Sequence, residues 1–501
     1  MKKLLLLLTV LLLAGPAYLL TTGTISVSSL SMLLNVMTGR GVETPQDDVI
    51  EQRFILPEGF AINLYAGDLP KARFLRFTDG GDLLVSRPHA GDIVLIHQNP
   101  DSPAVAGEQV TLLSGLTRPS GIDLADGWLY VGESNAVGRI RFDAQSGTVT
   151  GDYQHIISDL TDDGNHAYKA IRIGPDQKLY LSQGSTCNVC VEQDPRRATM
   201  SRFNLDGSAK EIIATGLRNS LGFDWAPWDG ALYATDNGRD MLGDDYPPCE
   251  LNKIEAGNFY GWPYYNGANE PDPDFTDPPA ALAKNPIAPV HEFRAHNAPL
   301  GMSFVNTQSW PATYDKVALA ALHGSWNRSS ADGYKVVSLH WENGQIKRRD
   351  FLSGFEKDGN IIGRPVDVAQ GPDGAIYISD DYAGAIYRVS YGEGQASVVA
   401  LPGSSKTTFK LQQPDWLTGL NTAQYMAQGK ALYGEHNCVS CHDPKTAVGN
   451  IALHNVNQRL QYNELIERLS MPTAPMPLFP LDLEDQRAVA VYLLSGEETP
   501  K

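Results

Sequence analysis

A short unit, in which a tight turn leads into an apolar strand, recurs six times between about residue 54 and residue 395. In most copies Asp-Gly or a related pair forms the turn, because Gly tolerates positive φ and Asp caps the turn. The strands that follow are of the Leu-Tyr-Val type, which suits a pleated and half-buried surface. The copies are residues 79–85, 126–131, 175–181, 229–234, the weaker 314–319, and 372–378.

The spacing of these copies predicts the fold. Periods of roughly 45 to 60 residues are typical of propeller blades of about four strands. An irregular β-sandwich or two separate sheets is the alternative, but sandwiches do not repeat their turn chemistry in this way. We therefore expect an all-β six-bladed β-propeller over residues 48–395. Its functional side chains should lie over the central channel, just before or after the repeated strands.

The pattern changes after the propeller. Residues 396–416 carry Gly, Ser, Lys and Pro without periodicity, which indicates a linker. Helical patterns then cover residues 422–436 and 483–494, with Asp482 as a candidate N-cap of the second helix. The sequence therefore predicts a small all-α domain over residues 417–501.

Cys438-Val439-Ser440-Cys441-His442, between these two helices, is the C-x-x-C-H haem attachment motif. Two thiols on one turn, Cys438 and Cys441, reach the two vinyl groups of haem, and the imidazole of His442 then meets the iron. We expect Met476 to be the second axial ligand, with Met471 as the competitor. A zinc site or a disulfide is the alternative. The interpretation is a cytochrome c domain with covalently bound haem c.

The N-terminal segment, residues 1–47, begins with the layout of a secretory signal and continues from residue 21 as a linker rich in Ser, Thr and Gly. Two Lys precede an apolar run at residues 4–13, which ends at Ala14-Gly15-Pro16. The run is shorter than the ~20 residues of a membrane helix, although an extension to Leu20 could remain as an anchor. A buried core helix is the alternative. We expect export to the periplasm or outside the cell, with a cleaved signal and a retained membrane tether both left open.

The formal net charge is −18, from 40 Lys and Arg against 58 Asp and Glu. Nucleic acid is excluded as a partner, because neutralising phosphates needs an excess of Lys and Arg. Five Cys are too few for a scaffold built on disulfides.

Three polar stretches lie beside the repeated strands, at residues 164–169, 216–223 and 236–240. They resemble the soluble sugar dehydrogenases that depend on pyrroloquinoline quinone (PQQ), which are six-bladed quinoproteins. The chain is closer still to their sorbosone and pyranose dehydrogenase branch. The motifs of this branch are Cys187-Asn188-Val189-Cys190 with residues 194–198, His323 to Arg328, and Arg364 to Val368. The resemblance covers roughly residues 54–391.

The resemblance implies two catalytic residues. His166 matches the general base, and a neutral imidazole that titrates near working pH can take a hydroxyl proton as hydride leaves. Arg218 matches an arginine that lies against the quinone and the substrate oxygens, where its charge stabilises the anionic reduced quinone.

The resemblance also implies cofactor contacts. Arg328 and Arg364 match residues that would bind the carboxylates of PQQ, for which a guanidinium fork is well suited. A surface salt bridge is the alternative for both. On the same interpretation, Asn219 and Asn237 are hydrogen-bond partners of the cofactor.

The family's calcium ion binds two successive backbone carbonyls, which here match Gly238 and Arg239. Calcium is a hard cation that prefers oxygen and would polarise a quinone carbonyl. The usual Gln-Gly-Pro of sugar dehydrogenases is Asn237-Gly238-Arg239 in this chain. The neighbouring acids are alternative ligands or simply a solvated loop; they are Asp240, Asp244, Asp245 and Glu250.

Cys187 and Cys190 have no following His, so they do not bind haem, and in an exported protein they could form a disulfide. Cys249 then remains as the odd thiol.

The expected function is an exported quinohaemoprotein. It would oxidise an aldose or a sorbosone-like aldehyde with PQQ and Ca²⁺ and pass electrons through its haem to a soluble carrier, such as a cytochrome or cupredoxin, or to a membrane oxidase. A calcium-dependent propeller hydrolase of the lactonase type and a non-enzymatic binding propeller tethered to haem are the alternatives.

Overall fold

The computed structural model describes residues 32, 35, 41–280, 282, 286–392, 399–401, 422–436, 438, 465–466, 468–469 and 481–494. The chain forms two compact units, Met1–Gly403 and Ser404–Lys501.

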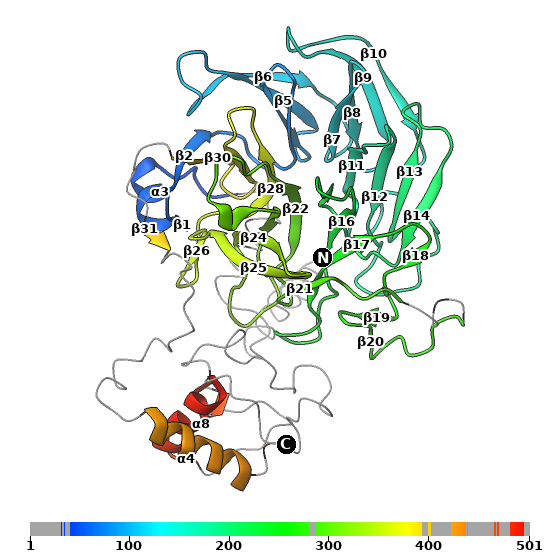
Figure 1. Ribbon diagram of the computed structural model, residues 1–501. Helices are drawn as coiled ribbons and strands as arrows, with labels where there is room; N and C mark the ends of the chain where they lie inside the picture. Colours follow the sequence, from blue (N-terminus) through cyan, green and yellow to red (C-terminus); the bar gives the residue numbers. More distant parts are fainter. Residues whose placement is uncertain are drawn as a thin grey trace, which may run out of the picture. The chain divides into compact units, whose positions relative to one another are not determined.

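The first unit is a six-bladed β-propeller (Figure 1). Each blade is an antiparallel sheet in which successive strands pair as neighbours. The first three blades are β3 (Leu75–Phe77), β4 (Leu83–Arg87), β5 (Asp92–Gln98), β6 (Ala106–Leu113); β7 (Ile122–Ala125), β8 (Trp128–Gly132), β9 (Val137–Asp143), β10 (Thr148–Ile157); and β11 (Lys169–Ile173), β12 (Leu179–Gln183), β13 (Thr199–Phe203), β14 (Glu211–Thr215). The last three blades are β15 (Phe223–Trp225), β16 (Leu232–Asp236), β17 (Cys249–Ile254), β21 (His291–Phe293); β22 (Pro299–Phe304), β23 (Val317–Leu322), β24 (Lys335–Glu342), β25 (Gln345–Leu352); and β28 (Pro365–Gln370), β29 (Ile376–Asp380), β30 (Ala385–Tyr391), β2 (Phe60–Ala66).

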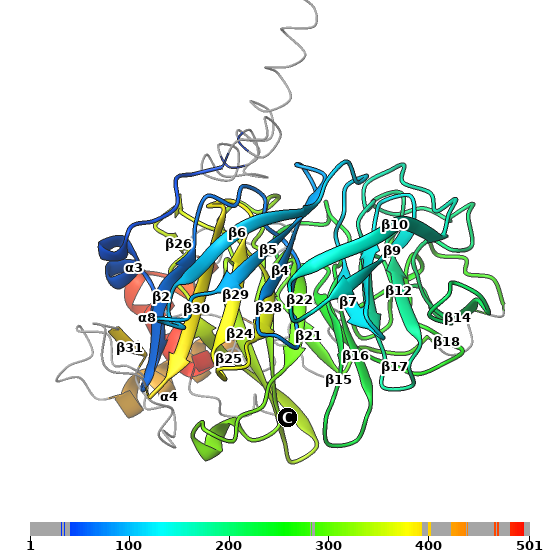
Figure 2. The ribbon, with the colours of Figure 1, turned by 90° about the horizontal axis from the view of Figure 1, so that it is seen from above.

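The ring closes by pairing the two ends of the propeller chain. Strand β2 comes from the N-terminal side and pairs antiparallel with β30, with Phe60 opposite Tyr391. In Figures 1 and 2 this places a blue strand beside the yellow strands of the last blade. Closure completes the last blade with a strand from the other end of the propeller chain, and only short edges remain on the blades.

Shorter elements decorate the propeller. Helix α3 (Asp47–Arg53) precedes β1 (Ile55–Pro57), which pairs in parallel with β31 (Val399–Leu401). The remaining elements are β18 (Asn258–Phe259), which adds to the third blade, the hairpins β19 (Tyr265–Asn266) with β20 (Glu270–Pro271) and β26 (Glu356–Lys357) with β27 (Asn360–Ile361), and the 3-10 helix η1 (Ala312–Tyr314). The longer spacing before the weak repeat is filled in part by β18, β19 and β20, which lie between β17 and β22 in the chain.

All six repeat units connect the first and second strands of a blade, so the prediction of six blades is confirmed and the sandwich alternative is wrong. The turn between β7 and β8 shows the reason for its sequence. Asp126 and Gly127 have φ of 50° and 72°, and Ala125 pairs with Trp128 across them. Two positive φ values define the type I′ hairpin, which matches the twist of the strands.

The core lies between the blades. The six residues of β23 are all buried, because each blade is covered on both faces by the two blades beside it. The Leu-Tyr-Val strand of the second blade is likewise inaccessible, with Leu129, Tyr130 and Val131 each 0% exposed. Burial of these apolar side chains drives the stacking of blades.

The second unit contains helices α4 (Thr422–Glu435) and α8 (Leu483–Leu494), close to the predicted bounds. The predicted cap is confirmed, since Asp482 Oδ1 accepts a hydrogen bond from the backbone N–H of Asp485 at 2.9 Å. The helices pack closely at Gly429, where a Cβ would lie 2.0 Å from the carbonyl oxygen of Ala488.

Of the predicted haem-binding residues, only Cys438 lies among the described residues. Cys438 is half-buried beyond the end of α4. Cys441, His442, Met471 and Met476 lie outside the described residues, so the cytochrome c domain stays a prediction. The predicted signal or anchor, within residues 1–20, also lies outside them. None of the helices in the described ranges is long and apolar enough to cross a membrane.

Candidate active site

The predicted site residues gather at one end of the propeller. Arg218 and Arg364 precede the first strand of their blades, whereas Asn237 and Arg328 follow the second strand. In an antiparallel pair the start of one strand and the end of the next lie together, opposite the turn that joins them. The loops at this end therefore surround the channel, and the Asp-Gly turns lie at the other end.

His166, on the loop before β11, is held by Ser185. Its Nδ1 lies 3.0 Å from the Ser185 carbonyl oxygen and 2.9 Å from Oγ of the same residue. A carbonyl only accepts hydrogen bonds, so Nδ1 carries the proton and Nε2 keeps a lone pair. Burial and the positive charge of Arg218 lower the pKa of His166 to about 3. The imidazole is thus neutral throughout the working range, rather than titrating near working pH as the resemblance suggested.

A glycine and a buried arginine fix the backbone around His166. A Cβ on Gly184 would lie 2.6 Å from Cβ of His166 and 2.7 Å from Oδ1 of Asn219, so only glycine allows this approach. The fully buried guanidinium of Arg197 donates to the carbonyls of Gly184, Ser185 and His166 at 2.6, 3.0 and 3.2 Å. Arg197 belongs to the motif at residues 194–198, but the spacing of that motif does not indicate hydrogen bonds to these three carbonyls.

Arg218 is 4% exposed and is bound on three sides. Its Nε donates to the carbonyl of Asn188 at 2.9 Å, and Nη2 donates to Oδ1 of the same residue at 2.9 Å. Nη2 also contacts Oδ2 of Asp240 at 3.2 Å, and Nη1 donates to the carbonyl of Asn237 at 3.2 Å. The guanidinium therefore has a defined orientation beside His166, whose pKa its charge lowers.

A carboxylate at the end of the second strand holds the backbone of two site arginines, Arg218 and Arg364. Asp236, ending β16, accepts the backbone N–H groups of Arg218 and Asn219 at 2.8 and 2.5 Å. Asp380, ending β29, accepts that of Arg364 at 2.9 Å. Burial raises the pKa of both carboxyls to about 6. Sequence reasoning did not assign this role, although each Asp directly follows a repeated strand.

The predicted calcium loop offers oxygen ligands. The Asn237 side-chain Oδ1 is buried and has no hydrogen-bond partner among the residues that the structure describes. The Arg239 guanidinium pairs with Asp272 at 2.7 Å and Asp274 at 2.8 Å, so its charge is balanced there. Gly238 packs where a Cβ would meet the Pro248 carbonyl at 2.4 Å. An unsatisfied amide oxygen next to backbone carbonyls fits a hard cation.

The neighbouring acids have protein partners instead. Asp240 contacts Arg218, Asp244 accepts hydrogen bonds from the backbone N–H and the hydroxyl of Ser329, and Glu250 accepts hydrogen bonds from Asn252 and from the N–H of Gly267. This disfavours them as the calcium ligands.

Arg328 and Arg364 are buried at 4% and 7% exposure, so neither belongs to a surface salt bridge. Nη2 of Arg328 lies 3.4 Å from Asp245, and its Nε has no partner within the described ranges. Arg364 donates to the carbonyls of His323 and Gly324 at 3.1 and 3.0 Å. Both amide atoms of Asn327 are buried and unpaired among the described residues. Such groups fit a polar ligand at this end.

A second charged cluster, missed from the sequence, lies at the same end. Asp381 contacts Arg73 at 2.5 Å and His323 at 2.9 Å. The Arg73 guanidinium stacks 4.9 Å from the ring centroid of Tyr168, two residues from His166. Burial lowers the pKa of His323 to about 4.

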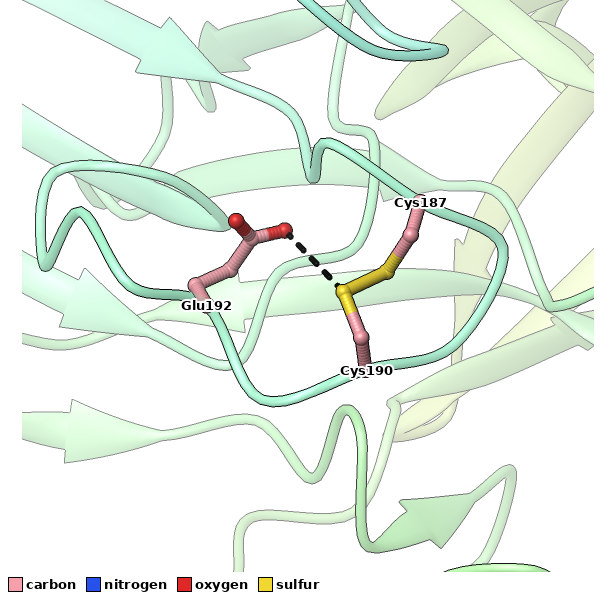
Figure 3. A group of neighbouring side chains, drawn as sticks. All are labelled: Cys187, Cys190 and Glu192. Atoms are coloured by element: carbon pink, nitrogen blue, oxygen red, sulfur yellow. Dashed lines mark hydrogen bonds between the residues drawn. A yellow bond between two sulfur atoms is a disulfide. The ribbon is translucent and has the colours of Figure 1, made fainter.

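The Cys187–Cys190 disulfide predicted for the third blade is present (Figure 3). Glu192 lies beside it, but sulfurs joined to each other are not free thiolates for a metal. Cys249 is buried, and burial raises the pKa of its thiol to about 11, which makes it unreactive.

Comparison with known proteins identifies the family. The model of the glucose / sorbosone dehydrogenase family matches residues 128–388. The chain belongs to this family. Similar curated proteins include an uncharacterized protein of Borreliella burgdorferi, 38% identical over 232 residues, and one of Synechocystis, 28% identical over 244 residues. The alignments cover 45% and 44% of this chain but only 61% and 54% of those relatives.

Solved structures share the fold of this glucose/sorbosone dehydrogenase family member. A Trichoderma reesei AA12 enzyme has a TM-score of 0.60 at 20% identity, covering 68% of this chain and 98% of that one. The holo PQQ domain of Coprinopsis cinerea pyranose dehydrogenase has a TM-score of 0.57 at 20% identity, covering 68% and 97%. The apo soluble aldose sugar dehydrogenase of Escherichia coli has a TM-score of 0.52 at 19% identity, covering 66% and 99%.

Proposed function

We propose that the chain is an exported dehydrogenase that oxidises an aldose or a sorbosone-like aldehyde with PQQ and Ca²⁺. The observation that carries this proposal is the tautomer of His166. Its Nδ1 is committed to Ser185, Nε2 keeps a lone pair, and the charge of the oriented Arg218 guanidinium acts on the ring. Family membership and the fold shared with a PQQ domain support it.

The residues around the channel fit these cofactors. Arg328, Arg364 and Asn219 would hold the carboxylates and oxygens of PQQ, and Asn237, Gly238 and Arg239 would hold Ca²⁺. Bound PQQ supplies a two-electron acceptor, and Ca²⁺ polarises its carbonyl.

The chain's own residues handle the substrate proton. Nε2 of His166 accepts the proton of the sugar hydroxyl, and Ser185 keeps the ring in the required tautomer. Asp240 stabilises the resulting imidazolium, since its negative charge raises the pKa of His166. Arg218 stabilises the negative charge that develops during the reaction. Its guanidinium is already oriented by hydrogen bonds, so no free energy is spent on turning it during the reaction.

The C-terminal unit would take up the electrons. Its C-x-x-C-H motif would bind haem c through Cys438, Cys441 and His442, with Met476 as the second axial ligand. Covalent fusion keeps this acceptor at a high effective concentration. The final acceptor would be a soluble cytochrome or cupredoxin, or a membrane oxidase.

The test is reconstitution of the full-length protein. Purified protein would be given a panel of aldoses and sorbosone-like aldehydes, and haem absorbance would be followed with PQQ and Ca²⁺ together, separately and omitted. We expect sugar-dependent haem reduction only with both. Absence of reduction across the panel would overturn the proposal, and calcium-dependent lactone hydrolysis in that protein would favour the hydrolase instead.

A further inference from the structure

The loop closed by the Cys187–Cys190 disulfide lies against the candidate active site. Strand β12 ends at Gln183, and the chain then passes Gly184 and Ser185 before entering this loop. Residues 186–198 form no strand or helix, so regular pairing does not order them. A disulfide restricts the conformations open to such a segment.

Asn188, inside the disulfide loop, binds Arg218 through two different groups. Its backbone carbonyl accepts from Nε, and its side-chain Oδ1 accepts from Nη2, both at 2.9 Å. Two parallel bonds on one edge of a guanidinium set both its position and its plane. A carboxylate usually supplies such a fork; here one residue supplies it without adding a negative charge.

The same side chain binds the predicted calcium loop. Oδ1 of Asn188 accepts the backbone N–H of Asp240 at 2.8 Å, and Nδ2 donates to the carbonyl of Asp240 at 3.0 Å. The amide therefore pairs with Asp240 as a neighbouring strand would. Residue 240 directly follows Gly238 and Arg239, so this pairing fixes the end of that loop.

The disulfide loop also reaches His166. Oγ of Ser185 donates to the carbonyl of Cys187 at 2.7 Å and contacts Nδ1 of His166 at 2.9 Å. The indole Nε1 of Trp262 donates to the Asn188 carbonyl at 3.3 Å from the other side. The loop is thus connected to the base, the arginine and the calcium loop.

We propose that Asn188, held by the Cys187–Cys190 disulfide, is the positioning residue that orients Arg218 and the Asn237–Asp240 loop. Its importance for catalysis rests on the proposed dehydrogenase function, whereas its effect on Arg218 does not. Asn188 acts through Arg218 and Asp240 and transfers no proton or electron itself.

The test is the rate at which phenylglyoxal modifies each arginine in the full-length chain, measured by peptide mass spectrometry. In Asn188→Ala we expect Arg218 to react roughly tenfold faster than in the wild type. The substitution removes the Oδ1 acceptor of Nη2 and the side-chain pairing with Asp240, which helps to hold the backbone carbonyl of residue 188 against Nε. Arg388, 1% exposed in the last blade, reports global unfolding and should react at the wild-type rate. Equal Arg218 rates in wild type and variant would overturn the proposal, as would an equal rise at both arginines.

Two further variants separate positioning from general packing. Asn188→Asp keeps the acceptor for Arg218 and loses the donor to Asp240, so its Arg218 rate should stay within about twofold of the wild type. In Cys187→Ser/Cys190→Ser the rate of Arg218 modification should lie between the rates of the wild type and Asn188→Ala. A wild-type rate in this double variant would remove the disulfide from the proposal. Val191→Ala, at a 59% exposed position next to the loop, is the matched control.

Kinetics connect the inference to the reaction. Asn188→Ala should lower kcat roughly tenfold with little change in KM, and Tm should fall by no more than about 4 °C. If the wild type oxidises no sugar, the proposed function fails and the labelling still decides the role of Asn188. If the wild type is active but the labelling does not change, only the inference fails.

Discussion

The two ends of the propeller differ in what their sequences repeat. At the turn end, Asp176, Asp229 and Asp373 each cap the backbone N–H two residues ahead, at 3.3, 3.0 and 3.1 Å. At the site end, the loops share few residues, and buried ion pairs such as Arg239 with Asp272 replace repeated turns. The comparison shows that the repeated end specifies the blades, whereas the irregular end carries the chemistry. Variants at the two ends should therefore separate stability from activity.

The largest effect should come from the base. We expect His166→Gln to lower kcat by about 10² to 10⁴-fold, because it removes the proton acceptor and keeps a polar side chain of similar size. Initial rates of sugar oxidation measure the loss, and thermal unfolding should show a Tm close to the wild type. A variant that retains the full rate would remove His166 from the mechanism.

The next largest effect is expected for Arg218→Lys, in which kcat/KM should fall about 10²-fold. An ammonium group cannot reproduce the planar contacts with Asn188 and Asp240. The matched control is Arg202→Lys, whose one-third exposed side chain pairs with Glu211 and Asp176 towards the turn end. Exposed ion pairs contribute about 0–1 kcal/mol, so the control should keep its activity. Similar losses in both variants would contradict a special role for Arg218.

The fold was largely predictable from the sequence because its signals are local. A turn such as Asp126-Gly127 and the cap at Asp482 each depend on residues close in the chain. Likewise, the three-residue separation of Cys187 and Cys190 was enough to suggest their disulfide.

The site residues were predictable from the sequence only where they match motifs of the family that the chain resembles. Arg73 and Asp381 are 308 residues apart, and no periodicity indicates their contact. The role of Asn188 depends on the packing of the third blade against the fourth, and that of Arg197 on how the loop before β11 meets the loop after β12. The structure brings His166 and Arg218 together as expected, and the roles assigned to the predicted site residues stay predictions.

At the site end, a buried carboxyl should make stability depend on pH. Burial and the nearby Asp236 raise the pKa of Glu250 to about 8 in the fold, above its ordinary value. A raised carboxyl pKa favours the folded state at low pH, and this contribution is lost as pH rises to about 8. As pH rises from 5 to 8, the free energy of unfolding of the wild type should therefore fall by about 2 kcal/mol relative to that of Glu250→Gln, which has no carboxyl to ionise. Urea unfolding with a chelator measures this, and a difference independent of pH would contradict it.

The smallest effect is expected at the turn end. Gly374 has φ of 79°, and a Cβ there would meet no atom within 4 Å. Gly374→Ala should thus destabilise the fold by about 1 kcal/mol through backbone strain alone, with kcat unchanged. Urea unfolding and initial rates together check this, and a fall in kcat would show that the two ends are coupled.

The central claim is that His166 removes the substrate proton in a PQQ-loaded propeller. It is tested most directly by mixing an aldose with wild-type protein reconstituted with PQQ and Ca²⁺ and following the quinone absorption in a single turnover. We expect rapid bleaching in the wild type and a rate lower by about 10² or more in His166→Gln loaded with the same amount of PQQ. Equal rates in the two proteins, or failure of the wild type to bind PQQ at all, would contradict the account.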